Sequence, residues 1–168
     1  MSEVHMISSN NKINPLNKYY NIAKVLLILA PFMSLMYLSM VSARIGFSIL
    51  QAIQQDPKLT ILFLVSMINP FIAYLLIFIQ RKIDDYGDVS YAVTNLVMFT
   101  IAEIMLQNIL YISLFGFILY KTLKTYKVTI KDSFKEKLSD GFLMTISGSL
   151  IVIALAGICL FATIRINM

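Results

Sequence analysis

The sequence predicts an all-α integral membrane protein, a bundle of four transmembrane helices with a short interfacial helix and a basic amphipathic helix in the cytosol. Hydrophobic residues make up 58% of the 168 residues and charged residues 14%, against about 45–50% and about 25% in soluble domains. A soluble chain of this size buries only about 70% of its surface, so lipid must cover the rest of the apolar residues. Long uncharged runs, each near the length of a membrane span, also recur along the chain.

Residues 1–21 are predicted to be a polar tail, and residues 22–168 a single transmembrane domain. The first span is expected over residues 22–43, because its uncharged core of 19 residues nearly matches the roughly 30 Å hydrocarbon layer when helical. Apolar residues then continue at helical spacing over 45–55, opposite serine and glutamine. That segment is too short to span the bilayer, which favours an interfacial helix.

The second span is expected over residues 60–80 and the third over 91–120. The third is long enough to tilt or to protrude from the bilayer. Between them lies an acidic turn in which Asp88 is a suitable helix N-cap. The fourth span, 142–164, carries no charge.

A basic amphipathic helix is predicted over residues 121–139. Its lysines recur every three or four residues and so occupy one face of a helix, with apolar residues opposite: Lys121, Lys124, Lys127, Lys131 and Lys135. Such a row favours binding to anionic lipid headgroups. Docking to an acidic protein is the alternative, and nucleic acid is not expected, because no aromatic residues interleave with the charges.

Membrane orientation follows from the distribution of Lys and Arg. Four spans would place both termini on one side of the membrane. With the termini outside, eight of these residues face the cytoplasm, and with the termini inside, six do. Since cytoplasmic loops carry the excess of positive residues, we expect a multi-pass protein of the bacterial plasma membrane with both termini outside. The connection between the third and fourth spans is then cytoplasmic.

Glu103 is the only charged residue inside the apolar runs, and a charge at that depth costs about 2.5–3.5 kcal/mol. Helical spacing places it in a polar stripe, to which the second span can add an amide: Thr100, Glu103, Gln107, Tyr111 and Asn69. Two interpretations remain open. Glu103 forms an ion or proton site, or it hydrogen-bonds to Asn69 or to a serine of another span and holds helices together.

Small residues recur at multiples of four along the fourth span and form one face: Gly141, Thr145, Ser149 and Gly157. Such a face lets helices approach closely. The spacing does not decide whether it packs within one chain or between two copies.

Few residues support catalysis. The chain has one histidine, His5, and one cysteine, Cys159, so neither a histidine-ligated metal site nor a disulfide is expected. Asp84, Asp85 and Asp88 have the spacing with which prenyl-diphosphate enzymes hold magnesium, but no second acidic motif accompanies them, and a solvated, capped turn is favoured.

The chain is therefore predicted to be a non-enzymatic membrane protein without a cofactor or a metal. The first hypothesis is an accessory, regulatory or immunity-type subunit that acts through helix–helix contacts with another membrane protein or with its own copies. The alternative is a homo-oligomeric channel or transporter for an ion or small solute that uses Glu103.

Overall fold

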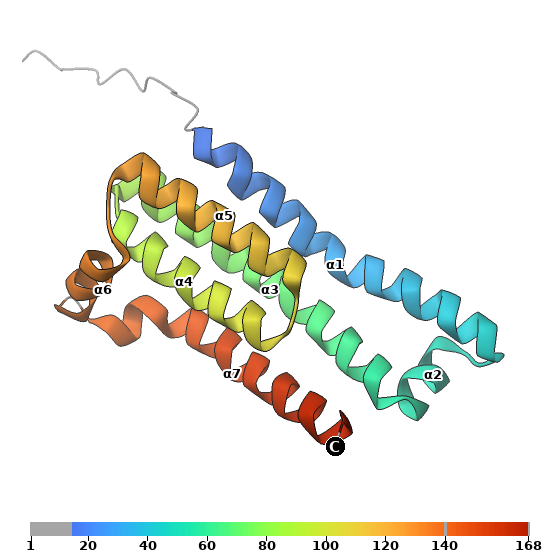
Figure 1. The fold of residues 1–168 in the computed structure, drawn as a ribbon. Helices are drawn as coiled ribbons and strands as arrows, with labels where there is room; N and C mark the ends of the chain where they lie inside the picture. The colour runs from blue at the N-terminus through green and yellow to red at the C-terminus, as the bar shows by residue number, and fades with distance from the viewer. Residues whose placement is uncertain (1–14, 140, 168) are drawn as a thin grey trace, which may run out of the picture.

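The computed structural model describes residues 15–139 and 141–167, which form seven helices and no strand. They are α1 (Pro15–Ile45), α2 (Ile49–Gln55), α3 (Pro57–Tyr86), α4 (Val89–Met105), α5 (Ile109–Tyr126), α6 (Ile130–Ser139) and α7 (Phe142–Asn167). Three of these helices, α1, α3 and α7, are long and apolar enough to cross a membrane (Figure 1). The prediction of an all-helical chain with long apolar candidate membrane spans is confirmed.

The long helices α1 and α3 pack side by side and run antiparallel (Figure 1). Their 31 and 30 residues correspond to about 45 Å of helix each. Each contains a proline near its middle, Pro31 in α1 and Pro70 in α3. Because proline has no N–H, the carbonyl four residues earlier loses its usual donor.

The prediction of one third span over residues 91–120 is wrong. Helix α4 ends at Met105, and α5 begins at Ile109 and packs back against α4 (Figure 1). Gln107 makes the reversal in the left-handed conformation, with φ 57°. Its N–H donates to the Ile104 carbonyl at 3.1 Å, and the Asn108 N–H donates to the Glu103 carbonyl at 3.1 Å. The residues between the two helices, 106–108, are called the α4–α5 turn below.

This reversal changes the arrangement of the termini. One end of the bundle carries α6 and is here called the α6 end (Figure 1). The last residues of α3, the first residues of α4 and the last residues of α5 all lie at this end. Helix α7 then runs to the opposite end, the α2 end, where α2 joins α1 to α3. Pro15 and Asn167 therefore lie at opposite ends of the bundle, an arrangement that differs from the one expected for four spans.

The basic segment 121–139 is also two helices rather than one. Helix α5 ends at Tyr126, and Lys127 follows in the left-handed conformation, with φ 54°. Helix α6 begins at Ile130, and the Thr129 hydroxyl accepts a hydrogen bond from the Asp132 N–H at 3.2 Å. A threonine in that position satisfies a free N–H of a first helical turn, so the chain starts a new helix here.

For two other predicted segments, the structure agrees with only part of the predicted range. The tail expected over residues 1–21 is helical from Pro15 onward, where Tyr20 is buried and its hydroxyl is 3.3 Å from that of Thr122 in α5. Residues 1–14 of that predicted tail lie outside the described residues. The segment 45–55 contains α2, which begins with a capping box of Ser48 and Gln51.

Candidate functional site: a cavity beyond the α4–α5 turn

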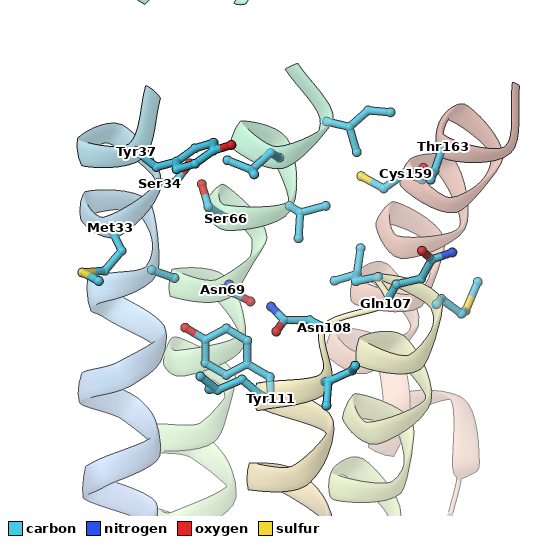
Figure 2. Close-up of a pocket in the computed structure, with 18 of the residues that line it drawn as sticks. Met33, Ser34, Tyr37, Ser66, Asn69, Gln107, Asn108, Tyr111, Cys159 and Thr163 are labelled. Carbon is cyan, nitrogen blue, oxygen red and sulfur yellow. The ribbon is translucent and has the colours of Figure 1, made fainter. Parts of the chain in front are cut away.

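A cavity of about 820 Å³ lies between α1, α3, the α4–α5 turn and α7 (Figure 2). Most of its lining is apolar, with Leu29 and Met33 from α1 and Leu62 and Val65 from α3. Ligand cavities in proteins span about 300–1,000 Å³ and combine apolar walls with a few polar groups. The size and the lining of this cavity are typical of a site for a small ligand.

The cavity exists because α4 and α5 are short. Their 17 and 18 residues reach about 26 Å, little more than half the length of α1 and α3. The α4–α5 pair therefore fills the bundle only at the α6 end. Beyond the turn, α1, α3 and α7 continue without a helix between them (Figure 1), and Lys58 at the start of α3 lines the cavity toward the α2 end.

The α4–α5 turn lies partway along the three long helices (Figure 1). All three long helices continue to expose large apolar side chains beyond it: Met36 of α1 is 64% exposed, Leu64 of α3 50% and Phe161 of α7 66%. Water would make such an exposed apolar belt unfavourable, and the belt is of the kind that faces lipid in candidate membrane spans. Irregular backbone at membrane depth is tolerated only where it is buried in protein or lines a cavity, and the turn satisfies that condition.

Three residues of the predicted polar stripe line the cavity: Asn69, Gln107 and Tyr111. Figure 2 shows the side chains of Asn69 and Asn108 pointing toward one another at the base of the cavity, with Tyr111 below them. Asn108 lies off the stripe on a continuous helix, and helical spacing alone misses it. The turn places Asn108 at the cavity, because α5 starts a new helical register.

The other two members of the stripe lie outside the cavity lining. Thr100 donates its hydroxyl to the Leu96 carbonyl of its own helix at 2.8 Å. Glu103 is fully buried in α4, and neither of its carboxyl oxygens has a hydrogen-bond partner among the described residues. The expected bond from Glu103 to Asn69 or a serine is therefore not formed in this part of the chain.

The small residues of α7 pack mainly inside the chain. Ser149 donates its hydroxyl to Oδ1 of Asn95 in α4, and Asn95 Nδ2 donates to the Thr145 carbonyl at 3.2 Å. A Cβ added at Gly157 would meet the Met105 side chain at 3.5 Å. Gly141 differs, because it lies before α7 with φ 91° and faces open space. Asn95 thus joins α4 to α7, a role that its position off the stripe did not reveal.

The five predicted lysines divide between α5, the linker and α6. Lys121 is half-buried, with its Nζ 5.6 Å from the centre of the Phe117 ring, and the other four are exposed. Lys137, outside the predicted row, is buried and forms an ion pair of 2.8 Å with Asp88. Together with the bond of 2.6 Å from Ser90 to Glu136, this pair fastens α6 to the first turn of α4.

The acidic turn acts as a cap. Asp88 accepts a hydrogen bond from the Tyr91 N–H at 2.9 Å, which confirms its predicted role as the N-cap of α4. Asp84 lies 3.4 Å from Nδ2 of Asn17. Within residues 15–139 and 141–167, no group of three metal-ligating side chains is found.

A comparison with family models, with curated proteins and with solved structures finds no match for this chain.

Proposed function

We propose that this chain is a non-enzymatic integral membrane protein that binds a small amphiphilic solute in the cavity, as a carrier or channel subunit does. The supporting observation is a cavity of ligand size whose base is an irregular turn partway along the long apolar helices. Polar groups at membrane depth are costly unless they serve a site or pair with one another. This geometry favours solute binding over the accessory-subunit role, at the cavity rather than at Glu103, which the channel or transporter hypothesis used.

We further propose that the α6 end faces the cytoplasm of the cell. Nearly all described Lys and Arg residues lie at that end, and the exceptions are Arg44, Lys58 and Arg165. Cytoplasmic segments carry the excess of positive residues. Because the α4–α5 pair returns to the α6 end, the difference in Lys and Arg number between the two ends is larger than the eight against six of the four-span arrangement. The start of α1 is then cytoplasmic, the end of α7 is outside, and the cavity lies in the outer half of the bilayer.

In this orientation, α6 rests on the inner leaflet. Its exposed Lys131 and Lys135, with Lys127 before it, can contact anionic headgroups, each contributing about 1 kcal/mol near the surface. Exposed Leu138 adds an apolar contact.

The native Cys159 allows a direct test of solute binding. It is the only cysteine of the chain, it lines the cavity, and it is 8% exposed. In lipid nanodiscs, we expect a decyl-chain amphiphile at ten times its Kd to slow modification of Cys159 by N-ethylmaleimide about tenfold, by mass action.

The matched control is the Cys159→Ser/Ser48→Cys variant, because Ser48 lies in the connection between α1 and α2, outside the cavity lining. Its labelling should not change when the amphiphile is added. If no amphiphile among decylamine, decanol, decyl methyl ether and decanoate slows labelling of Cys159, the proposed solute binding is wrong.

One observation favours the accessory-subunit hypothesis as a second candidate. Met33, Met36 and Met40 follow one face of α1, and all three are exposed. Methionine is a flexible residue that adapts to different partner surfaces. A transmembrane helix of a partner protein can lie along this methionine face.

For this candidate, the Met36→Trp substitution should abolish recovery of a stoichiometric partner from membranes, because a bulky ring in the contact blocks close helix approach. The Ile158→Trp variant, at a similarly exposed site on α7, should retain the partner. Retention of the partner by both variants, or a partner-free preparation of the wild-type chain, would contradict a docking role for α1.

A further inference from the structure

The helices that surround the cavity leave one of its sides open. Toward the α6 end, α5 packs against α1 and α4 packs against α7, so the α4–α5 pair closes the space between α1 and α7. Beyond the turn the pair ends, and among the described residues no other helix packs between α1 and α7 (Figure 1). Helix α3 packs against both and closes the opposite side. The cavity therefore has a gap between α1 and α7, here called the side opening.

The edge of the cavity lining is apolar and exposed. Met33 of α1 is 66% exposed, and Ile109 and Leu110 at the start of α5 are 79% and 61% exposed, although all three line the cavity. Lining side chains with such exposure lie at the boundary between the cavity and its surroundings. The exposed apolar belt of the long helices includes this edge, so the side opening suits contact with lipid chains rather than with water.

Two polar side chains lie deep in the cavity. Asn69 is 1% exposed and Ser34 is 7% exposed, and neither Asn69 Oδ1 nor Ser34 Oγ has a hydrogen-bond partner among the described residues. Together with the amides of Gln107 and Asn108, they offer both donors and acceptors, and so they fit polar heads of several kinds. Unpartnered buried polar atoms are unfavourable, and a polar head inside the cavity would satisfy them.

A route from water would start at the α2 end, where the exposed Lys58 lines the cavity. From there to Ser66 the path follows about 12 Å of α3, and the lining residues of α3 between them are Ile61, Leu62 and Val65. These side chains offer no hydrogen bond to a hydrated solute, which must lose its water before it reaches the polar groups. The side opening leads to the same polar groups directly from the lipid-facing surface.

We infer that the solute enters and leaves the cavity sideways, through the side opening between α1 and α7, and therefore belongs to the class of molecules that dissolve in the hydrocarbon of the bilayer. This inference rests on the proposed solute binding. In the orientation proposed above, the side opening faces the outer leaflet.

Two maleimides that dissolve in different places test the route. N-decylmaleimide partitions into the bilayer, whereas a sulfonated maleimide stays in water. In lipid nanodiscs, the labelling rate of Cys159 is divided by the rate of the same reagent at Ser48→Cys in a Cys159→Ser background, because Ser48 lies outside the cavity lining. We expect this normalised rate to be at least about tenfold higher for N-decylmaleimide, because a charged sulfonate is costly to bring through hydrocarbon.

Variants of the edge separate the side opening from other routes. Met33→Trp places a large ring at the opening and should slow labelling of Cys159 by N-decylmaleimide about tenfold. Met36→Trp is the matched control, because Met36 is 64% exposed on the same helix but lies outside the cavity lining, and its rate should not change. If Met33→Trp fails to fold, Leu110→Trp gives the same test.

Three results would overturn sideways entry. Equal normalised rates for the two maleimides would show entry from water. An unchanged N-decylmaleimide rate in a folded edge variant would show that the reagent does not pass the side opening. Failure of both reagents to label Cys159 would show that another chain covers the opening. In the first two cases, protection of Cys159 by an amphiphile would leave solute binding standing, and labelling through the side opening without such protection would contradict solute binding alone.

Discussion

The Ser48→Cys variant, in a Cys159→Ser background, is expected to react with a membrane-impermeant maleimide added to intact cells, whereas the Lys131→Cys variant reacts only after the membrane is permeabilised. Ser48 precedes α2 and Lys131 lies in α6, at opposite ends of the bundle. Because α4 and α5 return to the end from which they start, an odd number of full crossings separates these two positions. The effect is all-or-none in each variant, and gel-shift labelling measures it.

A continuous third span would give a different pattern. With four full crossings, Ser48 and Lys131 would lie on the same side and would label together. The Asn167→Cys variant completes the test, because the end of α7 should be reached from outside, like Ser48. Labelling of Ser48→Cys and Lys131→Cys under the same conditions would show that the α4–α5 pair crosses the bilayer completely.

Replacement of Glu103 is expected to give the largest change in stability. Glu103 is fully buried, with both carboxyl oxygens unpartnered among the described residues, and an ionisable side chain at membrane depth costs about 2.5–3.5 kcal/mol. Glu103→Leu keeps the packing and removes the polar atoms. It should therefore raise the free energy of unfolding by about 2–3 kcal/mol, measured by titration with SDS in mixed micelles.

Two further variants make the Glu103 result interpretable. Thr100→Val, one turn earlier, should change the free energy of unfolding by no more than about 0.5 kcal/mol. Glu103→Gln keeps a buried polar group and should fall well short of the gain from leucine. A loss of stability in Glu103→Leu would instead mean that the carboxyl group is bound, either to a hydrogen-bond donor that holds helices together or to a cation, as in the ion-site interpretation.

The hydrophobic pattern predicts the long helices well and the α4–α5 turn not at all. Helices α1, α3 and α7 follow from runs that match the thickness of a bilayer. The region 91–120 was anomalous, because its length exceeds one span and falls short of two. The residues at the reversal include neither glycine nor proline. The left-handed residue is Gln107, and glutamine is not a residue type that favours this region, so the local sequence carries no turn signal there.

The residues of the candidate site were likewise predicted in part, whereas the turn that arranges them was not. Gln107 and Tyr111 were predicted to share a face through a helical spacing that the turn interrupts, with Asn69 added from the second span. All three line the cavity because the turn folds α5 back against α4. The lysine spacing likewise persists across the Lys127 break, since steps of three and four residues survive a short linker. Periodicity thus identifies which residues share a face, but it does not reveal where a helix stops.

The return of α4 and α5 to the α6 end also affects how the chain enters the bilayer during synthesis. With that end in the cytoplasm, α4 and α5 enter the bilayer from the ribosome side, and no lysine between Tyr86 and Phe142 has to cross it. Only the short connection around α2 and the last residues of α7 must be moved across. The insertion machinery therefore transfers three positive residues, Arg44, Lys58 and Arg165, through the hydrocarbon, and α4 and α5 can enter together as one preformed pair.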